Sequence, residues 1–270
     1  AASLGTGCAV NRGPLLADRL PPRHHRPMDF TADLSLALQM ADAADAATVP
    51  RFRATGLVVE SKPDLSPVTD ADRATEQALR ALLAQERPGD GVLGEELGEA
   101  PAGERRWILD PIDGTVNYVR GIPVWGTLIA LEQAGEIVVG VVSAPLLHRR
   151  WWASRGGGAF GNGAPLRVSR VATLPDAQLS YNAHVTFEEC GYGLQALALS
   201  RRCWRTRGFG DFWSYMMVAE GAVDLAVDPV ARVWDLAPLE VIVEEAGGRF
   251  TDFSGSRRID GGTALVSNGL

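Results

Sequence analysis

The sequence has almost no lysine: Lys62 is the only one, and all other basic residues are arginines. The 33 acidic residues outnumber the 26 basic ones, which gives a formal net charge of −7. A nucleic-acid-binding protein needs a basic footprint for the phosphate backbone, so we expect no nucleic-acid partner. A small phosphorylated substrate is compatible with this charge, because bound divalent cations can invert the local field.

Cysteine is also scarce. The chain has three, Cys8, Cys190 and Cys203, at wide spacing. An odd number without a CxxC pair indicates neither a disulfide framework nor a zinc site of the CxxC kind. A reducing compartment is the default for such a chain, and we therefore expect a cytoplasmic protein.

No apolar run approaches the roughly 20 residues that a membrane-spanning helix needs. The longest candidate, residues 137–147, is broken by a glycine, a serine and a proline, so we expect no membrane partner. Residues 1–27 lack hydrophobic periodicity and the apolar core of a signal peptide. We expect them to be a disordered leader or upstream translation, with the native start near Met28.

The rest of the chain mixes helical and strand patterns. Residues 30–49 and 70–83 have the apolar period of helices, with Thr31 at the first N-cap and Thr69 or Asp70 at the second. Antiparallel strands are expected at residues 124–131, 137–142 and 150–153, short strands at 57–60, 92–93, 107–109, 250 and 264–266, and later helices at 214–220 and 237–245. This pattern predicts a mixed α/β (α+β) protein with two subdomains, residues 28–165 and 166–270, the first carrying an antiparallel sheet.

Two aspartates directly follow the apolar strand at residues 107–109. Asp110 stands at the strand end, and Asp113 follows three residues later with the backbone carbonyl of Ile112 between them. Hard oxygen ligands of this kind suit Mg²⁺. Gly114 and Thr115 can open a helix whose free N–H groups would meet a phosphate. Taken alone, the motif would equally fit two aspartates that cap a turn.

Other carboxylates occupy similar places. Glu95 and Glu96 also follow a short apolar strand, and Asp235 precedes an apolar helical segment. Adjacent glutamates usually lie on a solvated face, and a single aspartate is usually an N-cap. In one shared cleft, however, four carboxylates would repel one another strongly unless cations bridged them. The joint pattern therefore favours a metal site that contains Glu95, Asp110, Asp113 and Asp235.

Three segments carry a resemblance to a known family. They are GEE at residues 94–96, WILDPIDGTVNYVRGIPVW at 107–125 and VWDLAPLEVIVEEAGG at 233–248. Together they resemble the three motifs of the inositol monophosphatase family, over about residues 30–270. The resemblance implies a layered αβαβα sandwich of the sugar-phosphatase type. It also implies a phosphate monoester hydrolase with two or three Mg²⁺ ions per active site, commonly a homodimer.

The resemblance also implies roles for individual residues. The metal ligands would be Glu95, Asp110, the carbonyl of Ile112, Asp113 and Asp235. Asp72 and Thr115 would orient the attacking water, with Glu96 nearby. Lys62 falls near a position where the family often keeps a basic residue beside the metals, although an isolated surface lysine is the alternative. Val116 departs from the threonine or lysine more usual after Asp-Gly-Thr, which we expect to alter the pocket wall.

Rival phosphatase chemistries can be checked by spacing. A cysteine phosphatase needs an arginine six places after its cysteine, and those places hold Pro14, Ala196 and Phe209. An aspartyl-phosphate enzyme would have a DxD motif, whereas two residues separate Asp110 from Asp113. These patterns exclude a covalent phosphoenzyme of either kind and leave attack by a metal-bound water, as the resemblance implies.

Within the family, five segments resemble the actinobacterial type of histidinol-phosphate phosphatase. These are SKPDLSPVTDADRATE, ERPGDGVLGEE, VRGIPVW, VVSAPLLHRRWWA and RGFGDFWSYMMVAEGAVD. Histidinol phosphate carries an ammonium and an imidazole, so its pocket should contain acids. The resemblance implies that Gly210 and Asp211 fall in the family's substrate loop. It also implies that Asp228, seven residues before Asp235, matches a position where the family places an acid against the substrate; both acids can accept hydrogen bonds from such a substrate. Each acid can instead cap a turn or a helix.

Two other functions remain open on the sequence alone. One is hydrolysis of inositol 1-phosphate or another small sugar or nucleotide phosphate at the same site. The other is a non-catalytic metal-binding regulatory protein that retains the fold. The aromatic stretches at Trp125, Trp151, Trp152 and Trp213 are expected to lie in the core and at interfaces and not to stack on a substrate.

Overall fold

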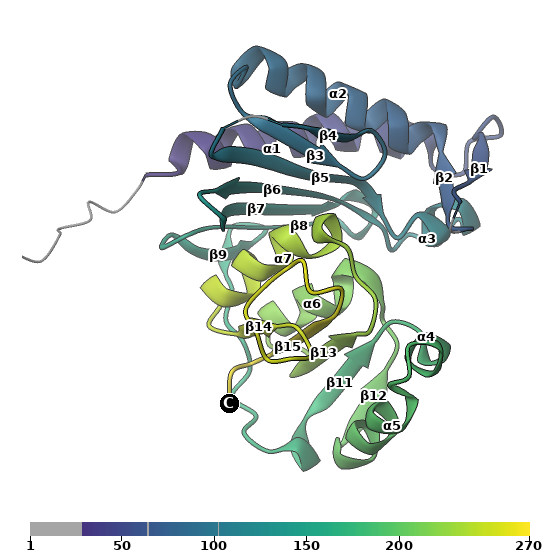
Figure 1. Ribbon diagram of the computed structural model, residues 1–270, viewed down its shortest axis with the longest axis vertical. Helices are drawn as coiled ribbons and strands as arrows, with labels where there is room; N and C mark the ends of the chain where they lie inside the picture. The colour runs from purple at the N-terminus through teal and green to yellow at the C-terminus, as the bar shows by residue number, and fades with distance from the viewer. Residues whose placement is uncertain (1–28, 64, 102) are drawn as a thin grey trace, which may run out of the picture.

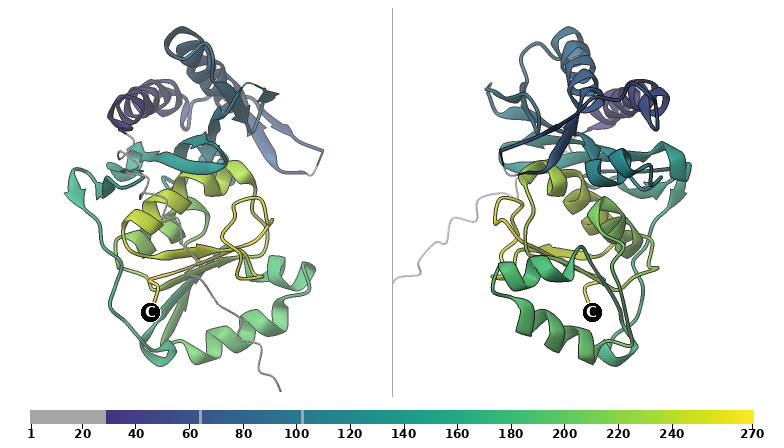
Figure 2. Two further views of the ribbon diagram at one scale, coloured as in Figure 1. Left: turned by 60° about the vertical axis from the view of Figure 1, so that its left-hand side comes forward. Right: turned by 90° about the vertical axis from the view of Figure 1, so that its right-hand side faces the viewer.

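The computed structural model describes residues 29–63, 65–101 and 103–270. The expected leader at residues 1–27 lies outside the described residues. Figure 1 shows five layers: helices α1 and α2, a large sheet, helices α6 and α7, a smaller sheet, and helices α4 and α5. The views in Figure 2 show the same order. The layered αβαβα sandwich expected from the sequence is confirmed.

The large sheet has eight strands in the order β10-β9-β8-β7-β6-β5-β3-β4. Its strands are β3 (Gly91–Gly94), β4 (Gly98–Ala100), β5 (Arg105–Asp113), β6 (Gly126–Gln133), β7 (Glu136–Ala144), β8 (Arg149–Ser154), β9 (Gly158–Gly161) and β10 (Ala164–Pro165). All neighbours are antiparallel except β3 and β5, which run parallel. The predicted antiparallel run is therefore confirmed.

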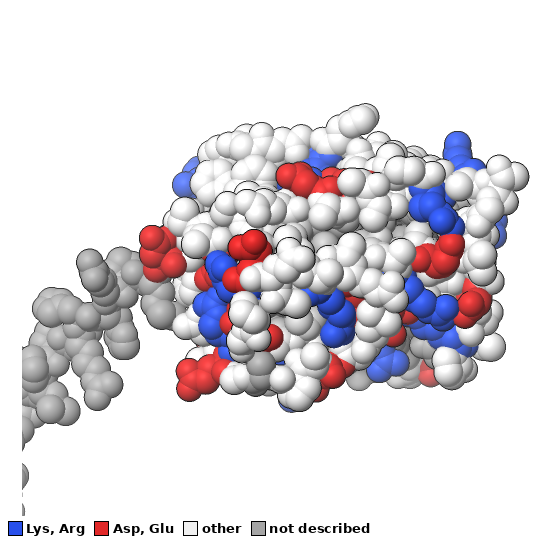
Figure 3. Space-filling model, turned by 90° about the horizontal axis from the view of Figure 1, so that it is seen from above, with Lys and Arg blue, Asp and Glu red and all other residues white. Residues whose placement is uncertain are grey.

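Helices α1 (Thr31–Thr48) and α2 (Asp70–Glu86) cover the outer face of this sheet. Their apolar side chains, among them Met40 and Leu79, pack with Trp107 of β5. Thr69 caps α2 as predicted, in a capping box with Asp72. The predicted cap at Thr31 is wrong, because Thr31 is already helical and the residue before it is Phe30. Viewed from this side, basic and acidic side chains are interspersed (Figure 3).

Helices α6 (Asp211–Ala219) and α7 (Val233–Glu245) lie between the two sheets. Residues 236–243 of α7 are all buried, as expected of a helix that contacts protein all round. Gly140 of β7 permits this packing: a Cβ there would lie 2.6 Å from the carbonyl oxygen of Pro238 and from a methyl group of Val241. The second sheet is thereby held against the first through α7.

The smaller sheet has the order β12-β11-β13-β15-β14, with β11 parallel to β12 and β13 and the other pairs antiparallel. Its strands are β11 (Gln178–Tyr181), β12 (Arg205–Arg207), β13 (Leu225–Asp228), β14 (Arg249–Thr251) and β15 (Ala264–Ser267). The outer helices are α4 (His184–Glu189) and α5 (Gly193–Arg202), which the sequence did not predict. A hairpin of β1 (Val59–Ser61) and β2 (Pro67–Thr69), helix α3 (Thr115–Arg120) and three 3-10 turns (Val49–Arg51, Pro145–Leu147, Leu174–Asp176) complete the described chain.

Several predicted boundaries need correction. The helix expected at residues 237–245 begins at Val233, and the one expected at 214–220 begins at Asp211. Pro238 is the sixth residue of α7 and lies inside the helix, where it cannot donate the backbone hydrogen bond to the carbonyl of Trp234. The strand expected at residues 57–60 covers Val59–Ser61, and α2 continues to Glu86. None of the described helices has the length and apolarity to cross a bilayer.

Candidate active site

Three aspartates meet where β5 ends against the start of α7. Asp110, Asp113 and Asp235 each offer one carboxylate oxygen, and these oxygens lie within 4.8 Å of one another. In a regular strand, residues three apart would point to opposite faces. The pairing of β5 with β6 is irregular between Asp110 and Asp113, and this irregularity brings both side chains to one place.

Each of two aspartates is held by a backbone N–H. Asp113 Oδ2 accepts a hydrogen bond from the N–H of Phe212 at 2.7 Å, and Asp235 Oδ2 accepts one from the N–H of Arg232, also at 2.7 Å. Asp235 is therefore the third residue of α7 and not a residue that precedes it. Because only one oxygen of each carboxylate is used in this way, the other can face a ligand.

The electrostatics of the cluster favour a cation. Asp110 is 1% exposed, and its Oδ1 is buried without a hydrogen-bond partner among the described residues. Burial, together with the charges of Glu95, Asp113 and Asp235, raises the pKa of Asp110 well above its usual range. Burial raises the pKa of Asp235 to about 7. An unpartnered buried carboxylate oxygen beside like charges is the environment that a hard divalent cation satisfies, so these residues fit a metal site.

Glu95 and Glu96 follow β3 and face Lys62. The Lys62 Nζ atom donates to Glu95 Oε1 at 2.6 Å and to Glu96 Oε1 at 2.7 Å. Burial lowers the pKa of Lys62, but its two hydrogen bonds outweigh this effect and raise it overall. Lys62 is thus part of the acidic site and not an isolated surface lysine. Glu95 contributes to the field at Asp110 but is not among the three aspartates whose oxygens converge.

Asp72 and Thr115 lie side by side, although α2 and α3 carry them. Asp72 is fully buried, and its Oδ2 accepts from the N–H of Thr69 at 2.8 Å. The Thr115 hydroxyl lies 3.4 Å from Asp72 Oδ1 and 2.9 Å from the carbonyl oxygen of Ile112. Burial raises the pKa of Asp72 to about 6. Gly114, at the N-cap of α3, has φ 80, a conformation that favours glycine.

The second group of predicted residues approaches from the smaller sheet. Gly210 and Asp211 have φ of 75 and 48 at the start of α6, and Asp228 ends β13 with 8% exposure. Asp228 Oδ1 accepts from the N–H of Val230 at 3.1 Å. Burial, and to a smaller extent the charge of Asp211, raises the pKa of Asp228 to about 7. The two acids therefore lie within electrostatic reach of each other.

Three residues of this region were not predicted from the sequence. Asn117 donates to Asp211. The hydroxyl of Tyr215 is buried without a described partner, and after burial the charges of Asp228, Asp235, Asp113 and Asp211 raise its pKa further. Glu76 accepts from the N–H of Glu96 at 2.8 Å. The only sequence feature that could have indicated one of them is the spacing of Tyr215, which follows Asp211 by four residues and therefore lies on the same face of one helix.

Glu76 explains the glycine before the two glutamates. A Cβ on Gly94 would overlap with the Glu76 carboxylate, which is fully buried. Glu76 also accepts from Arg80 Nε at 2.7 Å. The absence of a side chain at Gly94 therefore lets Glu76 fix the backbone that presents Glu95 and Glu96.

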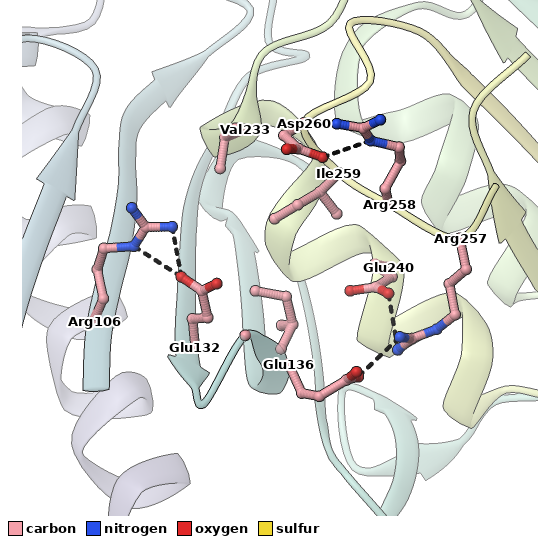
Figure 4. A pocket seen from close by; sticks show the side chains of 11 residues that line it. Arg106, Glu132, Glu136, Val233, Glu240, Arg257, Arg258, Ile259 and Asp260 are labelled. Carbon is pink, nitrogen blue, oxygen red and sulfur yellow. Dashed lines mark hydrogen bonds and ion pairs between the residues drawn. The ribbon is translucent and has the colours of Figure 1, made fainter. Parts of the chain in front are cut away.

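A separate cavity of about 230 Å³ lies beside α7 (Figure 4). It contains arginines, but each has an acidic partner. Arg106 pairs with Glu132 at 2.6 Å, and Arg257 pairs with Glu136 at 2.8 Å and with Glu240 at 2.9 Å. Arg258 pairs with Asp260 at 2.7 Å. Since these internal pairs already neutralise the guanidinium groups, the cavity is a poorer phosphate site than the aspartate cluster.

The chain is similar to characterised proteins over most of its length. Residues 31–269 match the model of the inositol monophosphatase family. A histidinol-phosphatase of Streptomyces coelicolor is 52% identical over 89% of this chain and 94% of its own length. A histidinol-phosphatase of Mycobacterium tuberculosis is 53% identical over 88% and 94%.

A solved structure supports the same relationship. The extragenic suppressor protein suhB of Bartonella henselae superposes with a TM-score of 0.82 at 31% identity, over 88% of this chain and 94% of that one. The resemblance seen in the three sequence motifs is thus confirmed over residues 31–269. The chain belongs to the inositol monophosphatase family.

Proposed function

We propose that this phosphatase hydrolyses L-histidinol phosphate to L-histidinol and phosphate, a step of histidine biosynthesis. The convergence of Asp110, Asp113 and Asp235 within 4.8 Å carries the phosphatase chemistry. The substrate is supported by the 52–53% identity to two histidinol-phosphatases. Two further acids, Asp211 and Asp228, stand beside the cluster, as a substrate with a cationic alcohol part requires.

The metal ligands in this proposal are Glu95, Asp110, the carbonyl oxygen of Ile112, Asp113 and Asp235, which would hold two or three Mg²⁺ ions. When bound, Mg²⁺ supplies a water of lowered pKa and neutralises the charge of the phosphoryl oxygens. Lys62 engages only Oε1 of Glu95, so the other carboxylate oxygen can serve as a ligand. Lys62 would remain beside Glu96 as a cation for the phosphate.

Asp72 and Thr115 are the residues that orient the attacking water, with Glu96 nearby. The Thr115 hydroxyl has one proton and two acceptor lone pairs. It can donate to Asp72 Oδ1 or to the Ile112 carbonyl, which lie 3.4 Å and 2.9 Å away, and still accept a proton of the water. The backbone N–H groups of Gly114 and Thr115 would bind the phosphate.

Gly210, Asp211 and Asp228 form the other wall of the proposed pocket. The two carboxylates would accept hydrogen bonds from the ammonium and the imidazole of the substrate. Trp125 and Trp151 are 0% and 1% exposed, so neither is available to stack on the imidazole.

The test is phosphate release from histidinol phosphate and from inositol 1-phosphate, each with and without Mg²⁺. We expect Mg²⁺-dependent release with a much higher kcat/KM for histidinol phosphate. The reverse ranking would assign the site to inositol phosphates or other small phosphate esters. No release from a wider panel of sugar and nucleotide phosphates would instead favour a non-catalytic metal-binding protein.

We also propose that the enzyme is a cytoplasmic homodimer without a nucleic-acid or membrane partner. Cys190 and Cys203 are free thiols, which agrees with a reducing compartment. Trp152 stacks on Phe160 at a centroid distance of 6.1 Å, and both rings stay partly exposed on β8 and β9. Light scattering after size exclusion measures the oligomeric state directly.

A further inference from the structure

Asn117 joins the metal-binding loop to the substrate loop. It lies in α3, directly behind Gly114 and Thr115, and its Nδ2 donates to the carbonyl oxygen of Val124 at 2.8 Å and to Asp211 Oδ2 at 3.1 Å. Asp211 is 94 positions away in the sequence. Both of these partners are pure acceptors, so the amide must present its NH₂ side to them, and both of its N–H groups are used.

The backbone at Asp211 and its carboxylate are held by different contacts. Asp211 has φ 48, in the left-handed region, directly after Gly210 with φ 75. Aspartate adopts this region more readily than most non-glycine residues. The N–H of Phe212 bonds to Asp113 at 2.7 Å and anchors the backbone. Among the described residues, the Asn117 amide donates the side-chain hydrogen bond that fixes the carboxylate itself.

The contact is tightly enclosed. A Cβ on Gly114 would lie 3.3 Å from Asp211 Oδ2 and 3.5 Å from Asn117 Nδ2. The Asn117 amide and the Asp211 carboxylate thus fill the space that Gly114 leaves. With Oδ2 engaged by the amide, Oδ1 of Asp211 is the oxygen left for a ligand.

We propose that Asn117 is a positioning residue that aims Asp211 at the cationic alcohol part of the substrate, and that it thereby sets the preference for a cationic phosphate ester. This inference rests on the proposed function. Asn117 acts on the preference through Asp211, and its own N–H groups are both occupied by protein acceptors.

The test is a double-mutant cycle with Asn117→Leu, Asp211→Asn and the double variant. Asn117→Leu removes both donors and keeps the branching at Cγ, and Asn117→Asp, which is isosteric, replaces it in the cycle if the larger leucine fails to fold. Each protein is assayed with histidinol phosphate and with glycerol 2-phosphate, which carries no cation. The readout is the ratio of the two kcat/KM values.

We expect Asn117→Leu to lower this ratio about tenfold, mainly by raising KM for histidinol phosphate. A tenfold change corresponds to the loss of one charge-assisted hydrogen bond between Asp211 and the substrate. In the Asp211→Asn background, Asn117→Leu should change the ratio less than twofold, because the negative charge that Asn117 positions is already removed. The matched control is Asn268→Ala. Asn268 Nδ2 likewise donates to two acceptors, Ser169 Oγ at 2.9 Å and the Val171 carbonyl at 2.7 Å, but outside the site.

The possible outcomes separate the two proposals. A wild-type enzyme that does not prefer histidinol phosphate overturns the proposed substrate and this inference with it. A wild-type enzyme with the preference, and an Asn117→Leu variant that keeps it, overturns only the role of Asn117. Equal losses for both substrates, like those of the Asn268→Ala control, or additive losses in the cycle, would show that Asn117 is merely structural.

Discussion

Neutralising Asp113 should stabilise the metal-free protein and abolish its response to Mg²⁺. The carboxylate oxygens of Asp110, Asp113 and Asp235 lie within 4.8 Å of one another. Two full charges at that distance repel by about 3.5 kcal/mol at an effective dielectric constant of 20. Asp113→Asn removes two of the three repulsions. Its remaining carbonyl oxygen can still accept the N–H of Phe212, so the backbone contact persists.

The expected gain is smaller than this Coulomb figure. The pKa values of Asp110 and Asp113 are raised well above their usual range, so protons already relieve part of the repulsion near neutral pH. We therefore expect Asp113→Asn to raise the free energy of unfolding in EDTA by about 2 kcal/mol. In the wild-type protein, Mg²⁺ at a hundred times its Kd should add about 2.7 kcal/mol. In the variant, this addition and phosphate release should both be lost.

The assay is urea unfolding of both proteins in EDTA and across an Mg²⁺ titration. Asp224→Asn serves as the control. Asp224 is 7% exposed and accepts from the N–H of Gln178 at 2.7 Å and from Ser169, away from the cluster. That variant should lose stability but keep the full Mg²⁺ response. The reasoning would be refuted if Mg²⁺ did not change the free energy of unfolding of the wild type. It would also be refuted if the Asp113→Asn variant were less stable than the wild type in EDTA.

Three further predictions concern single side chains. Thr115→Ala should lower kcat about a hundredfold in steady-state assays, because the hydroxyl beside Asp72 no longer orients the water; unchanged kcat would exclude that role. Tyr215→Phe should raise the free energy of unfolding by about 1 kcal/mol, since it removes a buried hydroxyl without a described partner; a loss would reveal a partner. Burial raises the pKa of Glu240 from 4.5 to about 7, so its contribution to stability is present below about pH 4.5 and is lost as the pH rises to about 7. Relative to Glu240→Gln, the wild type should lose up to about 3 kcal/mol across that window, and a pH-independent difference between the two unfolding curves would contradict this.

The sequence predicted the elements whose pattern is local. The alternation of apolar and turn residues indicated β6, β7 and β8, and the carboxylates after short apolar runs indicated which strand ends contribute to the acidic cluster. Thr69 was found as a cap because capping depends on residues within one turn. These locally encoded helices and strands are present in the folded protein because tertiary contacts stabilise the same elements.

What the sequence did not predict depends on contacts between distant segments. Helix α7 begins at Val233 and not at residue 237, because Asp235 caps its own first turn while also facing the cluster. Glu76 looked like one more polar residue of an amphipathic helix, yet it is buried under Gly94. No pattern along the chain links Asn117 to Asp211, because their contact exists only once both sheets are in place.

The acidic residues of the site come from both sheets. Asp110 and Asp113 end a strand of the large sheet, whereas Asp211 and Asp228 come from α6 and β13, which pack together at the smaller one. Asp235 lies on α7, the helix between the two sheets. Under the proposed function, substitutions at Asp211 or Asp228 should change which ester is preferred and leave the three converging aspartates intact. If this division is correct, Asp228→Asn should lower kcat/KM for histidinol phosphate at least tenfold while the Mg²⁺-induced stabilisation keeps its wild-type size. Loss of both together would mean that substrate and metal are held by one inseparable set of acids.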